Sequence, residues 1–367
     1  MIEGSGKNEL GPIKIIPQCI IILYLLMPYQ SGIAQTTGHG YQPEQYTCYK
    51  ATEKLNIDGL LDEADWGKAI PTKPFVDIEG EKRPLPWYET RVQMLWDEEY
   101  FYIAAELEEE NIWATYSQHD AVIYQENNFE VFIDPDGDTH NYYELEINAL
   151  GTVWDLLLTQ PYRDGGLAIN GWDISGLKKG VHLSGTLNDP ADTDRKWSVE
   201  LAIPWKAVTR QRPEEGSIWR VNFSRVEWRI EEENGNYQKT VDPSTGKPLP
   251  ENNWVWSPQG VVAMHQPETW GFVQFTETRA GEKPVAFRQN AEDEIKWQLR
   301  QVYYAERKHK KQYGQYTSQL SELGLKGPFF QQLLILADEH IFVARARSED
   351  HFLYIREDGR VWKEPVP

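Results

Sequence analysis

The sequence predicts a mainly β protein, an antiparallel β-sandwich or jelly roll of the DOMON-like kind, followed by a small C-terminal α+β module. The strand and turn pattern favours this fold, and the composition indicates a folded globular chain. Short runs of alternating apolar and polar residues recur between residues 91 and 275, and turn-forming residues separate them. Apolar residues make up 40% of the 367 residues and charged residues 26%, a composition typical of folded globular proteins rather than disordered or collagen-like chains.

The first segment, residues 1–35, has the order of a secretory signal peptide. An apolar run from Cys19 to Met27 precedes the small residues Ser31-Gly32-Ile33-Ala34, as expected before a cleavage site. The run is too short to span a bilayer comfortably and no longer run follows, so no membrane span is expected. We therefore expect an exported protein, periplasmic, at the cell surface or secreted, in which Cys48 has no internal disulfide partner.

Residues 41–278 are predicted to form the sandwich. In Trp197–Ile203, four apolar residues alternate with Ser198, Glu200 and Ala202, and this period of two is typical of a strand that covers a core with one face. Glu231–Asn253 is rich in charge, Gly and Pro, and is expected to be a long exposed loop. Further strands are predicted at Val92–Trp96, Tyr100–Leu107, Asn128–Asp134, Tyr142–Asn148, Thr152–Leu158, Trp219–Trp228 and Phe272–Thr276.

Residues 284–367 are predicted to form the α+β module, with one long helix at its start. From Asn290 to Tyr313, apolar residues recur at helical spacing, Asn290 is a suitable N-cap, and Gly314 follows the last turn. A short helix is expected at Ser318–Leu323. Strands are predicted near Leu333–Leu336, Ile341–Arg345, His351–Ile355 and Val361-Trp362.

Charge and aromatic content restrict the class of partner. The formal charge is −20, and since residues 281–367 carry 14 basic and 13 acidic side chains while residues 1–35 carry two of each, residues 36–280 carry −21. Such a surface repels phosphate backbones, so nucleic acid is not an expected partner. The 15 Trp, 19 Tyr and 12 Phe exceed what core packing usually demands, which is typical of proteins that present rings to a ligand.

Five blocks of sequence, in order, resemble a family 9 carbohydrate-binding module. This resemblance covers about residues 47–278 and implies a secreted sandwich that often accompanies enzymes degrading polysaccharides and often holds structural calcium. The blocks are Ile57-Asp58-Gly59-Leu60-Leu61-Asp62-Glu63-Ala64-Asp65-Trp66, Leu95-Trp96-Asp97-Glu98-Glu99-Tyr100-Phe101-Tyr102, Asn128-Phe129-Glu130-Val131-Phe132-Ile133-Asp134, Trp197-Ser198-Val199-Glu200-Leu201-Ala202-Ile203-Pro204-Trp205 and Pro267-Glu268-Thr269-Trp270-Gly271-Phe272.

The resemblance also implies a sugar site in which two tryptophans clamp a terminal ring. Here Tyr124 and Met264 occupy those places, Glu146 falls where an arginine is expected, and Glu130 matches a carboxylate of the site. Tyrosine can still stack on a pyranose, and Glu130 with Asn127 would bond hydroxyl groups. The alternative is that these polar residues form only the solvated face of a strand.

A second candidate surface is the loop that contains Tyr162 and Arg163, with Trp172 close behind. Arg163 supplies a rigid fork of donors, and loops on a rigid sandwich commonly bind ligands. The alternative is that Arg163 only pairs with Asp164 to set a turn.

Three short motifs contain side chains that could bind a cofactor. Asp134, Asp136 and Asp138 alternate in a turn and would suit calcium, although an ordinary acidic turn explains them as well. Met264-His265 could ligate haem only with a second ligand that the sequence does not identify, so haem is not expected. His119-Asp120 is interpreted as a surface or packing pair.

The predicted function is recognition of a polysaccharide or oligosaccharide, without chemistry of its own, in polysaccharide catabolism. Partners would be glycan-degrading enzymes or surface glycan-uptake machinery. No catalytic residue is singled out, because none of the familiar hydrolase signatures is present. Two alternatives stay open: a glycoside hydrolase or hydrolase-associated subunit acting on O-glycosyl bonds, and an envelope sandwich that has lost its sugar site.

Overall fold

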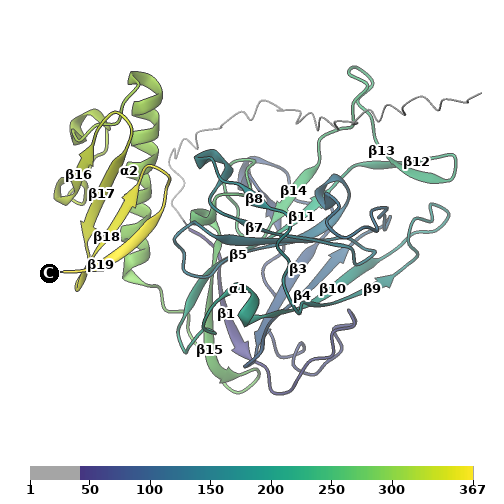
Figure 1. The fold of residues 1–367 in the computed structure, drawn as a ribbon. Coiled ribbons are helices and arrows are strands. Elements are labelled where there is room, and N and C mark those ends of the chain that lie inside the picture. The colour runs from purple at the N-terminus through teal and green to yellow at the C-terminus, as the bar shows by residue number, and fades with distance from the viewer. Residues whose placement is uncertain (1–41, 367) are drawn as a thin grey trace, which may run out of the picture. The chain divides into compact units, whose positions relative to one another are not determined.

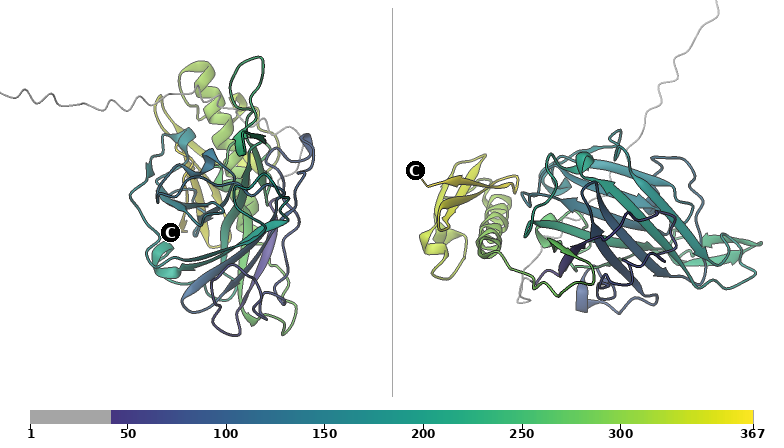
Figure 2. Two further views of the ribbon diagram at one scale, coloured as in Figure 1. Left: turned by 90° about the vertical axis from the view of Figure 1, so that its right-hand side faces the viewer. Right: turned by 90° about the horizontal axis from the view of Figure 1, so that it is seen from below.

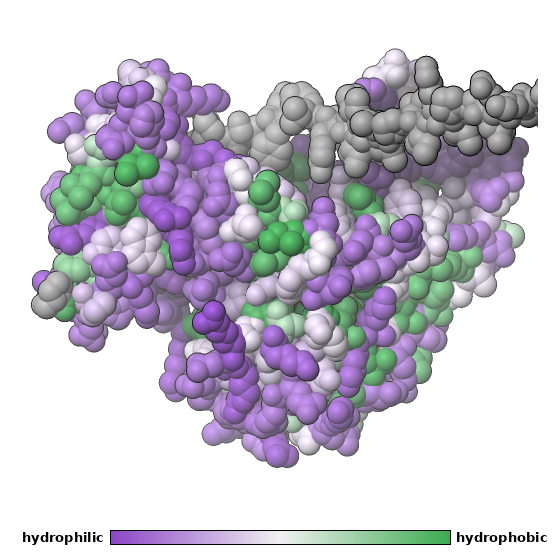
Figure 3. Space-filling model, in the orientation of Figure 1, coloured by the Kyte–Doolittle hydropathy of each residue, from purple (hydrophilic) through white to green (hydrophobic). Residues whose placement is uncertain are grey.

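The computed structural model describes residues 42–366, so the predicted signal segment 1–35 lies outside the described residues. As predicted, most of the regular structure is β-strand (Figure 1). None of the helices in this range has the length and apolar character needed to traverse a bilayer. Hydrophilic residues predominate on the face shown in Figure 3.

Thirteen strands form one continuous sheet. Their order is β8-β7-β6-β5-β11-β15-β1-β3-β4-β10-β9, with β14 paired to β11 and β2 paired to β14. The strands are β1 (Gln45–Lys50), β2 (Val76–Asp77), β3 (Thr90–Trp96), β4 (Tyr100–Glu108), β5 (Asn128–Asp134), β6 (Tyr142–Ile147), β7 (Val153–Leu158), β8 (Ala168–Ile169), β9 (Lys178–Ser184), β10 (Lys196–Pro204), β11 (Ile218–Glu227), β14 (Asn252–Val255) and β15 (Gly271–Arg279).

The two ends of this sheet are the layers of a β-sandwich (Figures 1 and 2). Val131 and Phe223 from one end belong to the same buried apolar cluster as Ile103 and Val199 from the other. The sheet is mixed rather than purely antiparallel, because β1 pairs in parallel with both β15 and β3. Sequence alternation specifies a strand but not the direction of its neighbours, so this difference was not predictable from the pattern.

The first block of the family resemblance anchors the sandwich. Trp66 is buried, and its Nε1 donates to Glu200 Oε1 of β10 at 2.7 Å. Glu200 Oε2 accepts from the backbone N–H groups of Asp58 and Gly59 at 2.9 and 2.7 Å. Gly59 has φ of +92°, and a Cβ there would lie 2.6 Å from backbone atoms of β9. The block therefore forms a turn and a core anchor.

Residues 231–253, predicted to be a loop, contain a hairpin instead. Strands β12 (Ile230–Glu233) and β13 (Asn236–Lys239) pair around Asn234-Gly235, both of which have positive φ, as tight hairpin turns require. The ammonium of Lys239 lies 3.3 Å from the ring centroid of Trp228. Because residues 231–253 are rich in charged residues, Gly and Pro, the sequence pattern did not predict these short strands.

Helix α2 (Ala291–Tyr313) opens the C-terminal module. The Asn290 side chain accepts from the N–H of Glu292 at 3.0 Å, and Gly314 ends the helix with φ of +83°, which confirms both predicted caps. Leu299 and Val302 of α2 pack with Phe342 and Ile355 in a separate apolar core. The four antiparallel strands are β16 (Leu334–Ala337), β17 (Phe342–Arg347), β18 (His351–Arg356) and β19 (Val361–Pro365).

Short helical segments connect these elements. They are α1 (Trp205–Val208) and the 3₁₀ turns η1 (Gly80–Lys82), η2 (Ile123–Gln125), η3 (Tyr162–Asp164), η4 (Pro267–Thr269), η5 (Leu320–Glu322) and η6 (Phe330–Gln332). The turns η2 and η3 carry Tyr124 and Tyr162, two of the predicted site residues.

Candidate carbohydrate-binding site

Three glutamates lie together on one face of the sheet. Glu130 of β5 is the cross-strand partner of Glu146 of β6, and Glu144 precedes it by two residues on the same face of β6. Cross-strand partners have Cβ atoms about 4.5–5.5 Å apart, so these side chains form one cluster, which we call the acidic trio. On the opposite face, Val131 and Leu145 pack into the sandwich core, and this packing fixes the orientation of the trio.

Folding removes the acidic trio from water. The exposed fractions are 3% for Glu130, 6% for Glu144 and 2% for Glu146. Burial raises the pKa of Glu130 to about 7, and burial followed by repulsion from the neighbouring carboxylates raises the pKa values of Glu144 and Glu146. The raised pKa values favour the protonated, neutral form of each carboxyl group. The trio can therefore offer both O–H donors and oxygen acceptors near neutral pH.

Tyr124 stands beside the acidic trio with 42% of its side chain exposed. Its backbone N–H donates to Glu146 Oε2 at 2.7 Å, and its carbonyl accepts from Trp228 Nε1 at 3.0 Å. The ring stacks on Trp154 of β7, with centroids 6.2 Å apart and planes inclined by 28°. Trp154 is the cross-strand partner of Glu146, so the stacked pair adjoins the acids.

Tyr162 reaches the same place from η3 and is 41% exposed. Burial, followed by repulsion from Glu144 and Glu146, raises the pKa of Tyr162. Its ring meets His265 edge-on, with centroids 4.4 Å apart. Burial lowers the pKa of His265 to about 3. The contact of 4.0 Å between His265 and Glu144 therefore joins a neutral imidazole to an acid and is not an ion pair.

Met264 lies at the edge of this face. It packs against a buried apolar cluster that includes Phe132 and Trp270, and Phe132 is the cross-strand partner of Glu144. Four predicted site residues thus lie on or beside one face: Tyr124, Glu130, Tyr162 and Met264. Their contacts with a sugar stay a prediction.

Asn127 is used differently from the prediction. Its Nδ2 donates to Glu227 Oε1 at 3.2 Å and Glu109 Oε2 at 3.4 Å, and its Oδ1 accepts from the N–H of Trp228 at 2.8 Å. These bonds hold the start of β5 to the end of β11 and leave the amide committed to structure. Asn128, one residue on, instead donates to Glu130 and Glu146 at 3.3 and 3.4 Å.

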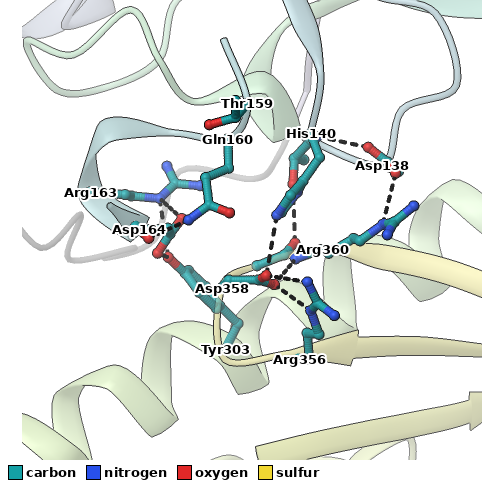
Figure 4. A network of polar contacts seen from close by, with 12 residues as sticks. Asp138, His140, Thr159, Gln160, Arg163, Asp164, Tyr303, Arg356, Asp358 and Arg360 are labelled. Atoms are coloured by element: carbon teal, nitrogen blue, oxygen red, sulfur yellow. Dashed lines mark hydrogen bonds and ion pairs between the residues drawn. The ribbon is translucent and has the colours of Figure 1, made fainter. Parts of the chain in front are cut away.

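Arg163 is also committed elsewhere (Figure 4). Its guanidinium pairs with Glu268 at 2.9 Å and with Asp164 at 3.3 Å, and its Nε donates to Tyr303 of α2 at 3.2 Å. Arg163 does pair with Asp164, as the alternative interpretation expected, but its further contacts with Glu268 and Tyr303 show that it does more than set a turn. Arg163 joins the sandwich to the C-terminal module, so we leave it out of the proposed sugar site.

Trp172 lies against the sandwich core. It packs on Tyr143, with ring centroids 4.8 Å apart, and Tyr143 points to the opposite face of β6 from Glu144 because side chains alternate along a strand. Trp172 is therefore also left out of the proposed site.

The residues that sequence reasoning missed are Glu144, Glu146 as a buried acid, and Trp154. The alternation Tyr142–Ile147 does show two glutamates on one face of a strand. Because a polar face normally meets solvent in an antiparallel sheet, nothing in that pattern indicated burial. A search for acids on strands next to Glu130 would have found them.

The acidic turn Asp134, Asp136 and Asp138 brings three carboxylates together. Asp134 accepts from the N–H groups of Gly137 and Thr139 at 3.0 and 2.9 Å, and Asp138 Oδ2 accepts from Arg360 at 3.1 Å (Figure 4). Three carboxylates, one already neutralised by a guanidinium, fall short of the six to eight oxygens that calcium takes. The turn fits calcium poorly, and calcium stays a prediction.

Comparison with known proteins gives a family match. Residues 57–245 match the model described as carbohydrate family 9 binding domain-like. Exoglucanase XynX of Acetivibrio thermocellus is 25% identical over 156 residues, 42% of this chain and 12% of that enzyme. Endo-1,4-beta-xylanase A of Thermoanaerobacterium saccharolyticum is 24% identical over 162 residues, 44% of this chain and 12% of that enzyme. The alignments thus span about an eighth of each enzyme's length.

Among solved structures, a family 9 carbohydrate binding module from Caldicellulosiruptor kristjanssonii in complex with cellotriose is similar. The identity is 14% and the TM-score 0.41, over 68% of this chain and 100% of that chain.

The family match includes most of the site. Residues 57–245 contain Tyr124, Trp154, Tyr162 and the acidic trio, together with four of the five sequence blocks. The match spans 189 of the 367 residues, more than half of the chain. The chain belongs to the carbohydrate family 9 binding domain-like family.

Proposed function

We propose that the chain binds an oligosaccharide or the end of a polysaccharide, without transforming it, beside the acidic trio. The observation that carries this proposal is a pair of tyrosines, 42% and 41% exposed, linked to buried carboxyl groups. The backbone N–H of Tyr124 donates to Glu146, and the ring of Tyr162 contacts His265, which lies 4.0 Å from Glu144. Tyr124 and Tyr162 supply flat apolar surfaces for the C–H face of a sugar ring. Sugars combine such faces with dense hydroxyl groups, and few other soluble ligands do.

The acids would bond the hydroxyl groups. Each hydroxyl of a sugar is both a donor and an acceptor, and hydrogen bonds to a charged oxygen are about twice as strong as neutral ones. Because the raised pKa values of the trio keep some protons bound, the site can match both roles. His265, neutral at physiological pH, adds one further polar group.

We also propose that the protein is exported and acts with glycan-degrading enzymes or uptake machinery. The signal-like pattern of residues 1–35 supports export, and the matches to parts of two polysaccharide-degrading enzymes support such a setting. N-terminal sequencing of the protein recovered outside the cytoplasm tests the export proposal.

Glycan binding by single variants tests the proposed site. A glycan array followed by titration calorimetry identifies a ligand for the parent protein. Tyr124→Ala and Tyr162→Ala should each raise the Kd on the order of tenfold or more, which corresponds to about 1.4 kcal/mol. Their melting temperatures should change little, because both side chains are partly exposed.

Tyr313→Ala is the matched control, since Tyr313 is exposed on α2 and remote in sequence from the site. Unchanged affinity in both Tyr124→Ala and Tyr162→Ala would show that the sugar binds elsewhere. Release of reducing ends from the same glycans, abolished by Glu130→Gln, would favour the hydrolase alternative instead.

A further inference from the structure

A second group of polar side chains gathers on the other side of β7. His119 and Asp120 come from the segment between β4 and η2, Asp155 from β7 and Asp173 from the loop before β9. One ligand atom from each lies within 4.8 Å of all the others. Three segments far apart in sequence thus converge on one point, and the prediction that His119-Asp120 is a simple surface pair does not account for this convergence.

Among residues 42–366, the buried carboxylate of Asp155 has no hydrogen-bond donor at one of its two oxygens. Its side chain is 3% exposed, and its Oδ1 is buried and accepts no hydrogen bond within the part of the chain that the structure describes. Its Oδ2 accepts from the N–H of Ile174, which turns Oδ1 toward His119. An unpaired buried oxygen of this kind costs about 1–3 kcal/mol, and more when it is charged.

The spacing agrees with that of ligands around a small divalent ion. His119 Nε2 lies 3.0 Å from Asp173 Oδ1, 3.4 Å from Asp120 Oδ1 and 3.8 Å from Asp155 Oδ1. Zinc holds nitrogen and carboxylate ligands at about 2.0–2.2 Å in a tetrahedron, so neighbouring ligand atoms are about 3.3–3.6 Å apart. The three observed distances scatter around that edge length.

The ligand set favours zinc over calcium. Imidazole nitrogen suits zinc and related transition metals, whereas calcium takes six to eight oxygens. The backbone also holds Asp120 in place, since it has φ of +63° and its N–H donates to the Val153 carbonyl at 3.0 Å. We propose that His119, Asp120, Asp155 and Asp173 bind one zinc ion.

The ion would tie together the two segments that carry the stacked rings of the sugar site. Tyr124 follows Asp120 by four residues, and Trp154 directly precedes Asp155. The zinc proposal does not depend on sugar binding, and its test needs no glycan.

Metal content and thermal stability test the proposal on the full chain. After incubation with zinc and removal of free metal, the parent should retain one zinc per chain, and added zinc should raise its melting temperature because an ion that binds the folded state stabilises it. His119→Ala and Asp173→Asn should weaken zinc binding by at least about tenfold and abolish the shift. Both side chains are more than half exposed, so these variants should fold.

His182→Ala and Asp62→Asn are matched controls, because both residues are exposed and lie outside the group. They should bind zinc as the parent does. Equal zinc binding by the parent and His119→Ala would overturn the proposal. So would a melting shift that calcium produces and zinc does not.

Discussion

Glu130 has a carboxyl group that folding takes almost completely out of water. Burial is the main reason that its pKa rises to about 7 in the folded protein, whereas the pKa of a glutamate in an unfolded chain is about 4.3. Between these two values the folded protein holds a proton that the unfolded chain releases. The free energy of unfolding must therefore fall as the pH rises through this window.

Glu130→Gln should remove the contribution of Glu130 to this pH dependence, while those of Glu144 and Glu146 remain. At pH 8 the variant should be more stable than the parent, on the order of 1–3 kcal/mol, because an amide needs no proton to be neutral. Near pH 4 the two proteins should be about equally stable. Urea denaturation at both pH values measures the difference.

Glu231→Gln, a change at an exposed site on β12, is the control and should leave the pH profile as it is. A Glu130→Gln variant less stable than the parent at pH 8 would contradict the raised pKa.

At the scale of elements, two adjacent asparagines at the start of strand β5 have different roles. One belongs to the structural scaffold and the other faces the acidic trio. Asn128 and Glu130 point to the face of the acidic trio, while the Asn127 amide is enclosed by Glu109, Glu227 and the Trp228 N–H. The sequence places two asparagines side by side, and nothing in their chemistry distinguishes them. Only the pairing of β5 with β11 decides which one belongs to the scaffold.

Asn127→Ala should therefore lower stability without changing glycan affinity. Its loss leaves buried Glu109 and Glu227 without an amide donor, which costs about 1–3 kcal/mol. Thermal melting measures the first effect, and calorimetric titration with the glycan bound by the parent measures the second. A large loss of affinity with unchanged stability would return Asn127 to the sugar site.

Elements defined by local periodicity were predictable from the sequence. Strand β5 has the predicted bounds, β10 extends its prediction by one residue at each end, and α2 begins one residue after its predicted N-cap. Apolar alternation and capping act within a few residues, so the sequence alone determines them.

The site was only partly predictable, because its burial is a tertiary effect. Glu144 and Glu146 lie on a strand face that alternation assigns to solvent, but the backbone N–H of Tyr124 bonds Glu146 there and His265 lies 4.0 Å from Glu144. Likewise, the sequence did not show that Arg163 donates to Tyr303 of α2 and is therefore not free to bind a sugar.

At the scale of the whole molecule, a polar network joins the sandwich to the C-terminal module (Figure 4). Asp164 of η3 accepts from Tyr303 and Arg307 of α2, both at 2.5 Å. Thr139 and Arg300 both donate to the Gly359 carbonyl, at 3.1 and 2.7 Å. Because the module has its own apolar core, these contacts decide how firmly it is held.

Arg163 is the centre of that network, and the ionisation of buried Glu268 depends on its positive charge. Burial opposes ionisation of Glu268, yet Arg163, followed by Arg300, holds its pKa at about 2. Removing one partner of a buried ion pair leaves an uncompensated charge and costs about 3–5 kcal/mol. Arg163→Gln and Glu268→Gln should each destabilise the protein by this order at pH 7, measured by urea denaturation. The double variant should lose clearly less than the sum of the two, because the partners interact directly.

Arg163→Gln should also loosen the module before the sandwich unfolds, so trypsin should cut within residues 280–289 faster than in the parent. Lys311→Gln, which removes an exposed positive charge from α2, should change neither stability nor cleavage. If Arg163→Gln binds the glycan as the parent does while its cleavage by trypsin is faster, Arg163 stabilises the contact between sandwich and module and does not bind the sugar. Additive losses in the double variant, with cleavage at the parental rate, would mean that the junction is held by contacts other than this pair.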